Sequence, residues 1–299
     1  MTTELRGVLT ALTTPFDADE NIDTTLLKKI VDRSIDAGVN GVVAGGSTGE
    51  FAAMSHDERR RLVDTVVTHT AGRVPVIAQT GATTTRGAIT LSRAAQESGA
   101  DVLMLVTPYY EALSLDETLA YIKDVAAAVD LPVMLYNIPA ATGVNLDACT
   151  AAALAHEVDN IRYIKDSSAN WGQALALIHH HSDVLGTFIG WDSYLYSALV
   201  EGAAGVMAGA ANVVPNEIVA VYRSIAAGDL DGALSQWRRL YPVIDALISV
   251  PFISAVKAGL RIQGEPVGSP RKPVSDLNAN ELAGVETALT ALAEARVGA

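Results

Sequence analysis

The sequence has few of the features that mark secreted, membrane-spanning or nucleic-acid-binding proteins. It contains one cysteine, Cys149, so no intrachain disulfide can form, and a reducing cytoplasmic location is expected. No run of about 18 uninterrupted apolar residues occurs, which predicts no membrane span, and residues 1–6 lack the apolar segment of a signal peptide. Lys and Arg number 21 against 34 Asp and Glu, a formal charge of −13. Phosphate backbones and anionic membranes attract clustered Lys and Arg, so we expect neither as a partner.

Aromatic residues are also scarce. They make up 5% of the 299 residues, whereas hydrophobic residues as a whole make up 49%. The core should therefore consist mainly of Ala, Val, Leu and Ile. A chain of this length can form one large domain or two ordinary ones.

Short apolar runs rich in β-branched residues alternate with longer helical patterns along most of the chain. The runs are continuously apolar, as expected for parallel strands buried on both faces. Eight β–α units at a spacing of roughly 30 residues predict a (β/α)8 TIM barrel, an α/β fold; an open doubly wound sheet is the alternative. The predicted strands are Gly7–Thr13, Gly41–Gly45, Pro75–Thr80, Asp101–Thr107, Pro132–Asn137, Ile161–Asp166, Val184–Ile189 and Gly205–Gly209.

Residues 1–226 are predicted to form the catalytic barrel domain, and residues 227–299 a C-terminal helical region packed on it. No strand pattern remains after the eighth unit, and three helical patterns fill the second range. Within the barrel, Ser55–Glu58 and Ser114–Glu117 fit the capping box, in which Ser and Glu satisfy free backbone donors at a helix start.

Lys165 is the only one of the six lysines that lies on a predicted strand. Burying an ammonium ion costs several kcal/mol unless the ion is paired or neutral. A neutral amine is the nucleophile that covalent chemistry on a ketone requires. The strand alone leaves two interpretations open: a catalytic amine, or a lysine that pairs with Asp166 or extends to the surface.

The carboxyl ends of the strands are where a barrel of this kind carries its active groups. A lysine, tyrosines, hydroxyls and glycine-rich backbone are all predicted to meet at this rim, which favours a functional role for Lys165. The predicted strand ends are Thr13–Pro15, Gly45–Glu50, Thr107–Tyr110, Tyr136-Asn137, Lys165-Asp166, Gly190–Asp192 and Ala208-Gly209.

The segment Gly45–Glu50 places three glycines around two hydroxyls, between a strand and a helix. Such a backbone can turn its N–H groups inward to hold an anion. The glycine spacing differs from a dinucleotide fingerprint, and no lysine follows as in a Walker loop. A carboxylate is the anion that fits the absence of a basic residue; a plain tight turn is the alternative.

Tyr136 ends the fifth predicted strand, next to the strand of Lys165. A phenol in this position can relay a proton, although a core tyrosine with a satisfied hydroxyl is the alternative. The tract His179–His181 lies in a helical pattern, where successive side chains point about 100° apart and cannot share one ion. We therefore predict no metal site.

Taken together, these motifs resemble the dihydrodipicolinate synthase / N-acetylneuraminate lyase family of class I pyruvate-dependent aldolases. The resemblance covers essentially the whole chain, from the first strand through the C-terminal helices. It rests on Gly45–Glu50, Thr107–Tyr110, Tyr136–Pro139 with Thr142-Gly143, and Lys165-Asp166, in this order.

The resemblance implies a Schiff-base mechanism that uses no cofactor. Lys165 would form a covalent imine with the keto carbon of pyruvate or another 2-oxo acid, and Tyr136 would move protons. Ser47 and Thr48 would bind the carboxylate, with Ser47 also relaying protons. Tyr110 would reach across a dimer interface into the neighbouring active site, which implies a homotetramer arranged as a dimer of dimers.

Two positions depart from the family's pattern at the aldehyde end of the site. Dihydrodipicolinate synthases carry an arginine two residues after the proline of the Tyr-Asn-x-Pro segment, and this position is Ala141, which cannot form a bidentate pair with a carboxylate. Sialic acid lyases carry a glutamate after the Gly-x-Asp segment, and this position is Ser193. Trp191 and Phe252 add apolar bulk there. The remaining substrate-binding candidates are Gly46, Gly190, Asp192 and Ala208.

The sequence therefore predicts a lyase that makes or cleaves a C–C bond between pyruvate and an aldehyde. The expected substrate is a 2-keto-3-deoxy sugar acid or a 4-hydroxy-2-oxo acid. Alternatives are a 4-hydroxy-tetrahydrodipicolinate synthase, which joins pyruvate to aspartate semialdehyde, with an altered aldehyde site; a deoxy sugar acid dehydratase; and a non-catalytic 2-oxo-acid-binding protein.

Overall fold

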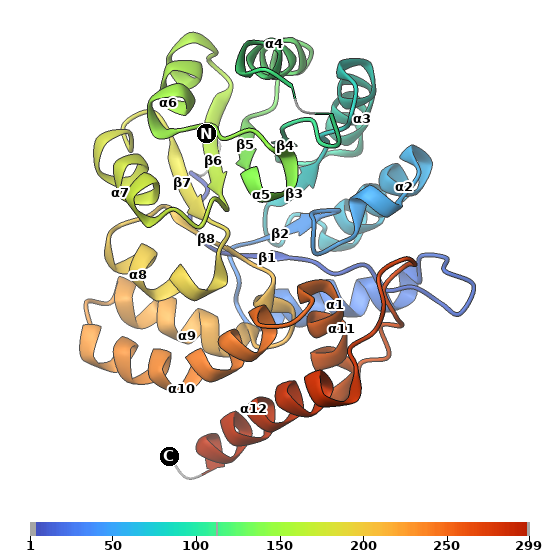
Figure 1. Ribbon diagram of the computed structural model, residues 1–299, viewed down its shortest axis with the longest axis vertical. Helices are drawn as coiled ribbons and strands as arrows, with labels where there is room; N and C mark the ends of the chain where they lie inside the picture. Colours follow the sequence, from blue (N-terminus) through green and yellow to red (C-terminus); the bar gives the residue numbers. More distant parts are fainter. Residues whose placement is uncertain (1–3, 112, 298–299) are drawn as a thin grey trace.

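Eight parallel strands close into a barrel (Figure 1). The computed structural model describes residues 4–111 and 113–297. The strands are β1 (Gly7–Ala11), β2 (Gly41–Ala44), β3 (Val76–Gln79), β4 (Val102–Val106), β5 (Val133–Asn137), β6 (Ile161–Asp166), β7 (Gly186–Ile189) and β8 (Gly205–Ala208). Each strand pairs with its neighbours in sequence, and β1 pairs with β8. This closure confirms the predicted TIM barrel and excludes the open sheet.

Helices alternate with the strands, and most of them form an outer ring around the barrel (Figure 1). They are α1 (Thr24–Asp36), α2 (His56–Thr70), α3 (Thr85–Ser98), α4 (Leu115–Ala126), α5 (Pro139–Thr142), α6 (Ala148–Glu157), α7 (Trp171–His180), α8 (Leu195–Val200), α9 (Pro215–Ala226), α10 (Leu230–Ile248), α11 (Phe252–Ile262) and α12 (Ala279–Val297). Short 3-10 turns are η1 (Phe51–Ala53), η2 (Asp192–Tyr194) and η3 (Ala210–Asn212). Within the described ranges, no helix has the length and hydropathy needed to cross a membrane.

Local sequence signals account for the starts of two helices. At α2, Ser55 accepts a hydrogen bond from the Glu58 amide while the Glu58 carboxylate accepts one from the Ser55 amide. Ser114 and Glu117 make the same reciprocal pair at α4. Both predicted capping boxes are confirmed.

The strand side chains build two apolar layers because successive residues of a strand face opposite sides of the sheet. One layer fills the barrel and contains Met104, Met134, Tyr136 and Met207. The other lies between the barrel and the helices. The packed interior leaves the carboxyl ends of the strands as the place where polar side chains can gather.

The C-terminal helices pack along one side of the barrel. Helix α10 contacts α9 and α12, and α11 contacts α12; in Figure 1 they lie together with α1 below the strands. The end of α10 and the start of α11 lie close to the carboxyl ends of the strands, because Ile248, Phe252 and Ile253 line the cavity there. The predicted C-terminal region therefore contributes a wall to the candidate site.

Candidate active site

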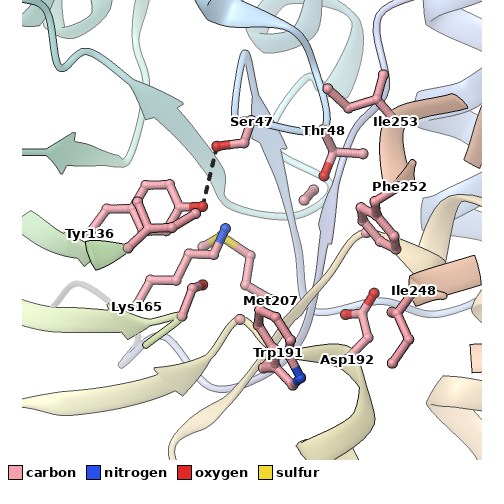
Figure 2. Close-up of a pocket in the computed structure, with 15 residues that line it drawn as sticks. Ser47, Thr48, Tyr136, Lys165, Trp191, Asp192, Met207, Ile248, Phe252 and Ile253 are labelled. Atoms are coloured by element: carbon pink, nitrogen blue, oxygen red, sulfur yellow. Dashed lines mark hydrogen bonds between the residues drawn. The ribbon is translucent and has the colours of Figure 1, made fainter. Parts of the chain in front are cut away.

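A cavity of about 280 Å³ lies at the carboxyl ends of the strands, and we call it the central cavity (Figure 2). Eight residues predicted from the sequence line it: Ser47, Thr48, Tyr136, Lys165, Gly190, Trp191, Asp192 and Phe252. Seven further lining residues were not named among the predicted site residues: Ala11, Ile138, Ser167, Met207, Gly209, Ile248 and Ile253.

Lys165 is held beside Tyr136 by the pairing of β5 and β6. The two residues are partners in the parallel register, so both side chains point to the same face of the sheet. The Nζ atom of Lys165 lies 4.0 Å from the centroid of the Tyr136 ring, and Lys165 is 5% exposed. Among the described residues Lys165 forms no ion pair. The alternative of a surface lysine or a pair with Asp166 is therefore wrong.

Gly190 leaves the space that the lysine side chain occupies. A Cβ atom at this position would lie 2.5 Å from the Cε atom of Lys165 and 2.3 Å from the Oγ atom of Ser167. Both distances are shorter than van der Waals contact, so a larger residue would displace Lys165 or Ser167. The Ser167 hydroxyl is buried and has no hydrogen-bond partner among the described residues. It is available to a bound substrate.

Asp166 lies on the opposite face of β6, where neutral groups donate hydrogen bonds to its carboxylate. Its carboxylate accepts hydrogen bonds from Asn137 at 2.9 Å, Ser168 at 2.9 Å and Gln173 at 3.1 Å. Burial raises the pKa of Asp166, and these hydrogen bonds oppose the shift. Asn137 and Asp166 follow Tyr136 and Lys165 in the same register, so this network holds together the ends of the two strands that carry the candidate catalytic pair.

The loop after β2 brings hydroxyl and amide groups to the other side of Tyr136. The hydroxyls of Ser47 and Tyr136 lie 3.2 Å apart (Figure 2). The amides of Gly49 and Glu50 close the turn onto the Gly46 and Ser47 carbonyls. The amides of Ser47 and Thr48 make no hydrogen bond within the described part of the chain. They remain free for an anion, as the predicted carboxylate site requires.

Asp192 contributes a buried carboxyl on the wall opposite Tyr136 (Figure 2). One of its oxygens accepts a hydrogen bond of 3.0 Å from the Ala210 amide. Burial raises the pKa of Asp192 to about 6, while the amides of Ala210 and Gly209 and the charge of Lys165 lower it. Trp191, at 40% exposure, and Phe252 make this end of the cavity bulky and apolar.

A second buried lysine ties the loop to α11. Lys257 is 0% exposed, and its Nζ atom lies 2.6 Å from Glu50 Oε1. The other Glu50 oxygen accepts a hydrogen bond of 2.8 Å from the Arg271 amide. Glu50 itself has φ 61°, a left-handed conformation that few non-glycine residues adopt. This pair was not predicted from the sequence, where its only signal is a lysine within the apolar helical run Ala255–Leu260.

The other predicted site residues lie outside the wall of the central cavity. Gly46 precedes Ser47 in the loop, Ala208 precedes Gly209 at the end of β8, and Ser193 follows Asp192 in η2. Tyr110 is 92% exposed, with φ 88°. Its predicted role is to reach across a dimer interface into the active site of a neighbouring chain.

Ala141 lines a second cavity, also of about 280 Å³, which we call the side cavity. Ser47, Ile138 and Ile253 line both cavities, so the two share a wall. The side cavity is otherwise lined by Glu50, Phe51, Ala52, Ala53, Val106, Tyr109, Ala141, Thr142, Arg271, Lys272, Pro273 and Val274.

Metal-ligating residues do not gather at either cavity. Across the described ranges, no group of three or more His, Cys, Asp or Glu side chains could hold a metal ion. Of the histidine tract, His179 and His180 are exposed at the end of α7, and His179 contacts Glu201 at 3.0 Å.

Comparison with known proteins gives consistent matches along the chain. The model of the dihydrodipicolinate synthetase family matches residues 4–292. A 4-hydroxy-tetrahydrodipicolinate synthase of Oceanobacillus iheyensis is 36% identical over 283 residues, covering 95% of this chain and 96% of the relative. A protein of Halobacterium salinarum named as an uncharacterized DapA-like lyase is 38% identical over 292 residues, covering 96% and 94%.

A solved structure of a member of the same family also matches this chain. YagE, a prophage protein of Escherichia coli K12 described as belonging to the dihydrodipicolinic acid synthase family and crystallised in complex with pyruvate, superposes with a TM-score of 0.93. It is 31% identical, and the match covers 97% of this chain and 99% of YagE. Sequence and structure therefore agree from end to end, and this chain belongs to the dihydrodipicolinate synthetase family, whose members are carbon–carbon lyases of the class I pyruvate-dependent aldolase type.

Proposed function

We propose that the protein joins pyruvate to a short aldehyde through an imine at Lys165. The observation that carries this proposal is the placement of a buried lysine, which forms no ion pair within the described ranges, beside a tyrosine–serine hydroxyl pair. Imine formation requires a free amine that reaches the keto carbon, and hydroxyl groups beside it can take up and return protons.

The proposed reaction begins when the Nζ atom of Lys165 attacks the keto carbon and the carbonyl oxygen leaves as water. The resulting iminium ion accepts the electron pair released when C3 loses a proton, which gives an enamine. The enamine carbon then attacks the aldehyde carbon, and the aldehyde oxygen takes a proton. Water finally adds to the iminium and releases the product and Lys165.

Tyr136 is our candidate for the group that carries these protons. Its hydroxyl lies 3.2 Å from that of Ser47, so a proton can pass between the two. The free amides of Ser47 and Thr48 are candidates for binding the pyruvate carboxylate. No step of this scheme requires a metal ion or a cofactor.

For the aldehyde, we propose aspartate semialdehyde, which would make the protein a 4-hydroxy-tetrahydrodipicolinate synthase. The names of the relatives favour this alternative over the sugar-acid substrate predicted from the sequence. Cleavage of a 2-keto-3-deoxy sugar acid remains the second candidate, because Ala141 places no cation at the position where the resemblance calls for an arginine.

Borohydride reduction in the presence of pyruvate tests the imine. We expect one reduced pyruvate adduct, located on Lys165 by peptide mass spectrometry and lost in Lys165→Ala. Lys123→Ala, which removes a partly exposed lysine paired with Glu157, is the control and should keep the adduct. Absence of any adduct on the wild-type protein would overturn the mechanism.

Activity measurements distinguish the two candidate reactions. Condensation of pyruvate with aspartate semialdehyde should exceed release of pyruvate from 2-keto-3-deoxy sugar acids in kcat/KM. The reverse order, with the adduct still formed, would favour the second candidate.

A further inference from the structure

The side cavity lies beside the reaction centre and has a largely apolar lining. It shares Ser47, Ile138 and Ile253 with the central cavity that contains Lys165. Phe51, Val106 and Tyr109 are among its other lining residues. A substrate covalently bound at Lys165 would therefore have this space next to it, large enough for a few carbon atoms.

Three charged residues line the side cavity, and two of them are already occupied. Glu50 is bound by Lys257 and by the Arg271 amide. The Arg271 guanidinium donates to the Glu58 carboxylate, to the Ala53 carbonyl at 2.8 Å and to the Glu20 carbonyl. Neither group can turn to a ligand without breaking these contacts.

Lys272 is the third charged residue, and its ammonium group is uncommitted. The side chain is exposed, and within the described ranges it has no hydrogen bond and no ion pair. The chain as a whole is acidic, with a formal charge of −13. An unpaired ammonium group beside a cavity is a local positive charge, and it attracts an anion.

The backbone next to Lys272 is fixed relative to the reaction centre. The Arg271 amide donates to Glu50, three residues after Ser47 in the loop that lines both cavities. The position of Lys272 is thus set by the same loop that carries the candidate carboxylate site. Ala141 lines the same cavity and offers no charge.

We propose that Lys272 binds the anionic end of the aldehyde substrate, a carboxylate, in the side cavity. This inference rests on the proposed function, because it assigns the side cavity to the aldehyde that the pyruvate enamine at Lys165 attacks. A lysine on the segment 271–274 then fills the role for which Ala141 is unsuited, and specificity is directed toward aldehydes with a carboxylate.

The test compares charged and uncharged aldehydes in Lys272 variants. For Lys272→Met, we expect KM for aspartate semialdehyde and succinate semialdehyde to rise by about tenfold, the low end for a lost hydrogen bond to a charged group. KM for butanal and glyceraldehyde should change by less than about twofold, since these carry no anion to lose. Lys272→Arg should retain most of the affinity, and Lys272→Glu should raise KM further than Lys272→Met.

The controls separate this proposal from the one on which it rests. Lys123→Met should leave all four KM values unchanged, and every Lys272 variant should still form the reduced pyruvate adduct at Lys165. Unchanged KM for the carboxylate aldehydes in Lys272→Met, with the adduct intact, would overturn the role of Lys272. Failure of wild type to form the adduct would instead overturn the proposed function. A stronger Lys272 dependence for glyceraldehyde 3-phosphate would overturn the carboxylate in favour of a phosphate.

Discussion

Lys165 and Lys257 are both buried, but they are placed in different chemical surroundings. Lys257 contacts a carboxylate at 2.6 Å and a backbone carbonyl at 3.0 Å. Lys165 contacts the face of Tyr136 and forms no ion pair among the described residues, although the Asp192 carboxyl lines the same cavity. Burial alone therefore does not distinguish a nucleophile from a structural cation. The direct contacts differ: a salt bridge and a hydrogen bond hold Lys257 in place, whereas Lys165 forms neither within the described ranges.

Asp192 provides a pH-dependent charge at the same site. Its pKa, raised to about 6 by burial, means that the carboxyl is neutral below this pH and negative above it. A negative carboxylate can balance a cationic iminium at Lys165, so we expect turnover to rise as the pH increases through about 6. In Asp192→Asn this rise should be absent from the profile of kcat against pH. Asp231→Asn, an exposed aspartate on α10, is the control.

The same group also links stability to pH. The folded-state pKa lies above the ordinary value of 3.8, so Asp192 favours folding fully below about pH 4 and loses this contribution as the pH rises through about 6.

The kinetic prediction for Asp192 has a clear contrary outcome. An identical rise of kcat near pH 6 in wild type and Asp192→Asn would assign the titration to another group.

At the scale of elements, the loop Gly45–Glu50 depends on a helix about two hundred residues away. Lys257→Met would leave the Glu50 carboxylate buried without a cation, which typically lowers the free energy of unfolding by about 3–5 kcal/mol. The double variant Glu50→Gln/Lys257→Met should lose less than the sum of the two single variants, because neither charge then stays unpaired. Urea unfolding at one fixed protein concentration measures both effects.

A second ion pair serves as the comparison. Lys123 and Glu157 also lie 2.6 Å apart, but both side chains are more than a third exposed. Lys123→Met should therefore lower stability by less than about 1 kcal/mol. Equal losses for Lys257→Met and Lys123→Met would mean that the buried pair has no special role in holding the loop.

The elements themselves could be predicted, because each carries its signal locally. All eight strands lie within the predicted runs, since a strand buried on both faces is continuously apolar. The Ser55 and Ser114 caps lie three residues from their glutamates. Lys165 and Tyr136 could be singled out because barrel topology brings the ends of successive strands together.

The parts that could not be predicted depend on contacts between distant segments. The partners Glu50 and Lys257 are far apart in sequence, as are Arg271 and Glu58. No periodicity encodes such pairs. The side cavity was missed for the same reason, since its wall joins the loop after β2 to the segment 271–274, which the sequence marks only as a loop rich in proline.

At the scale of the whole molecule, the exposure of Tyr110 bears on assembly. Its side chain is 92% exposed and lies outside the central cavity of its own chain. We expect a homotetramer, four times the chain mass of 31.3 kDa, in which Tyr110 completes a neighbouring site. Light scattering after size exclusion measures the mass.

Mixed oligomers test whether Tyr110 acts in a neighbouring chain. Lys165→Ala and Tyr110→Phe should each have low turnover alone. Co-refolded together, the first chain supplies Tyr110 to a partner that retains Lys165, so part of the wild-type turnover should return. No recovery in mixtures whose exchange is verified by mass would assign Tyr110 to its own chain or to no catalytic role.

The salt bridge between Glu50 and Lys257 also limits which C-terminal segments can be exchanged between homologues. A chain ending at Ala226 would keep all eight strands, yet it would lack the cation opposite Glu50 and the cavity residues Ile248, Phe252 and Ile253. The segment 269–276 connects further, through Arg271, to Glu58. In chimeras made by recombination, crossovers after β8 would therefore be tolerated only where the incoming tail restores a lysine and an arginine at these two positions. The segment that must be exchanged as one piece to keep the active site is therefore larger than the barrel.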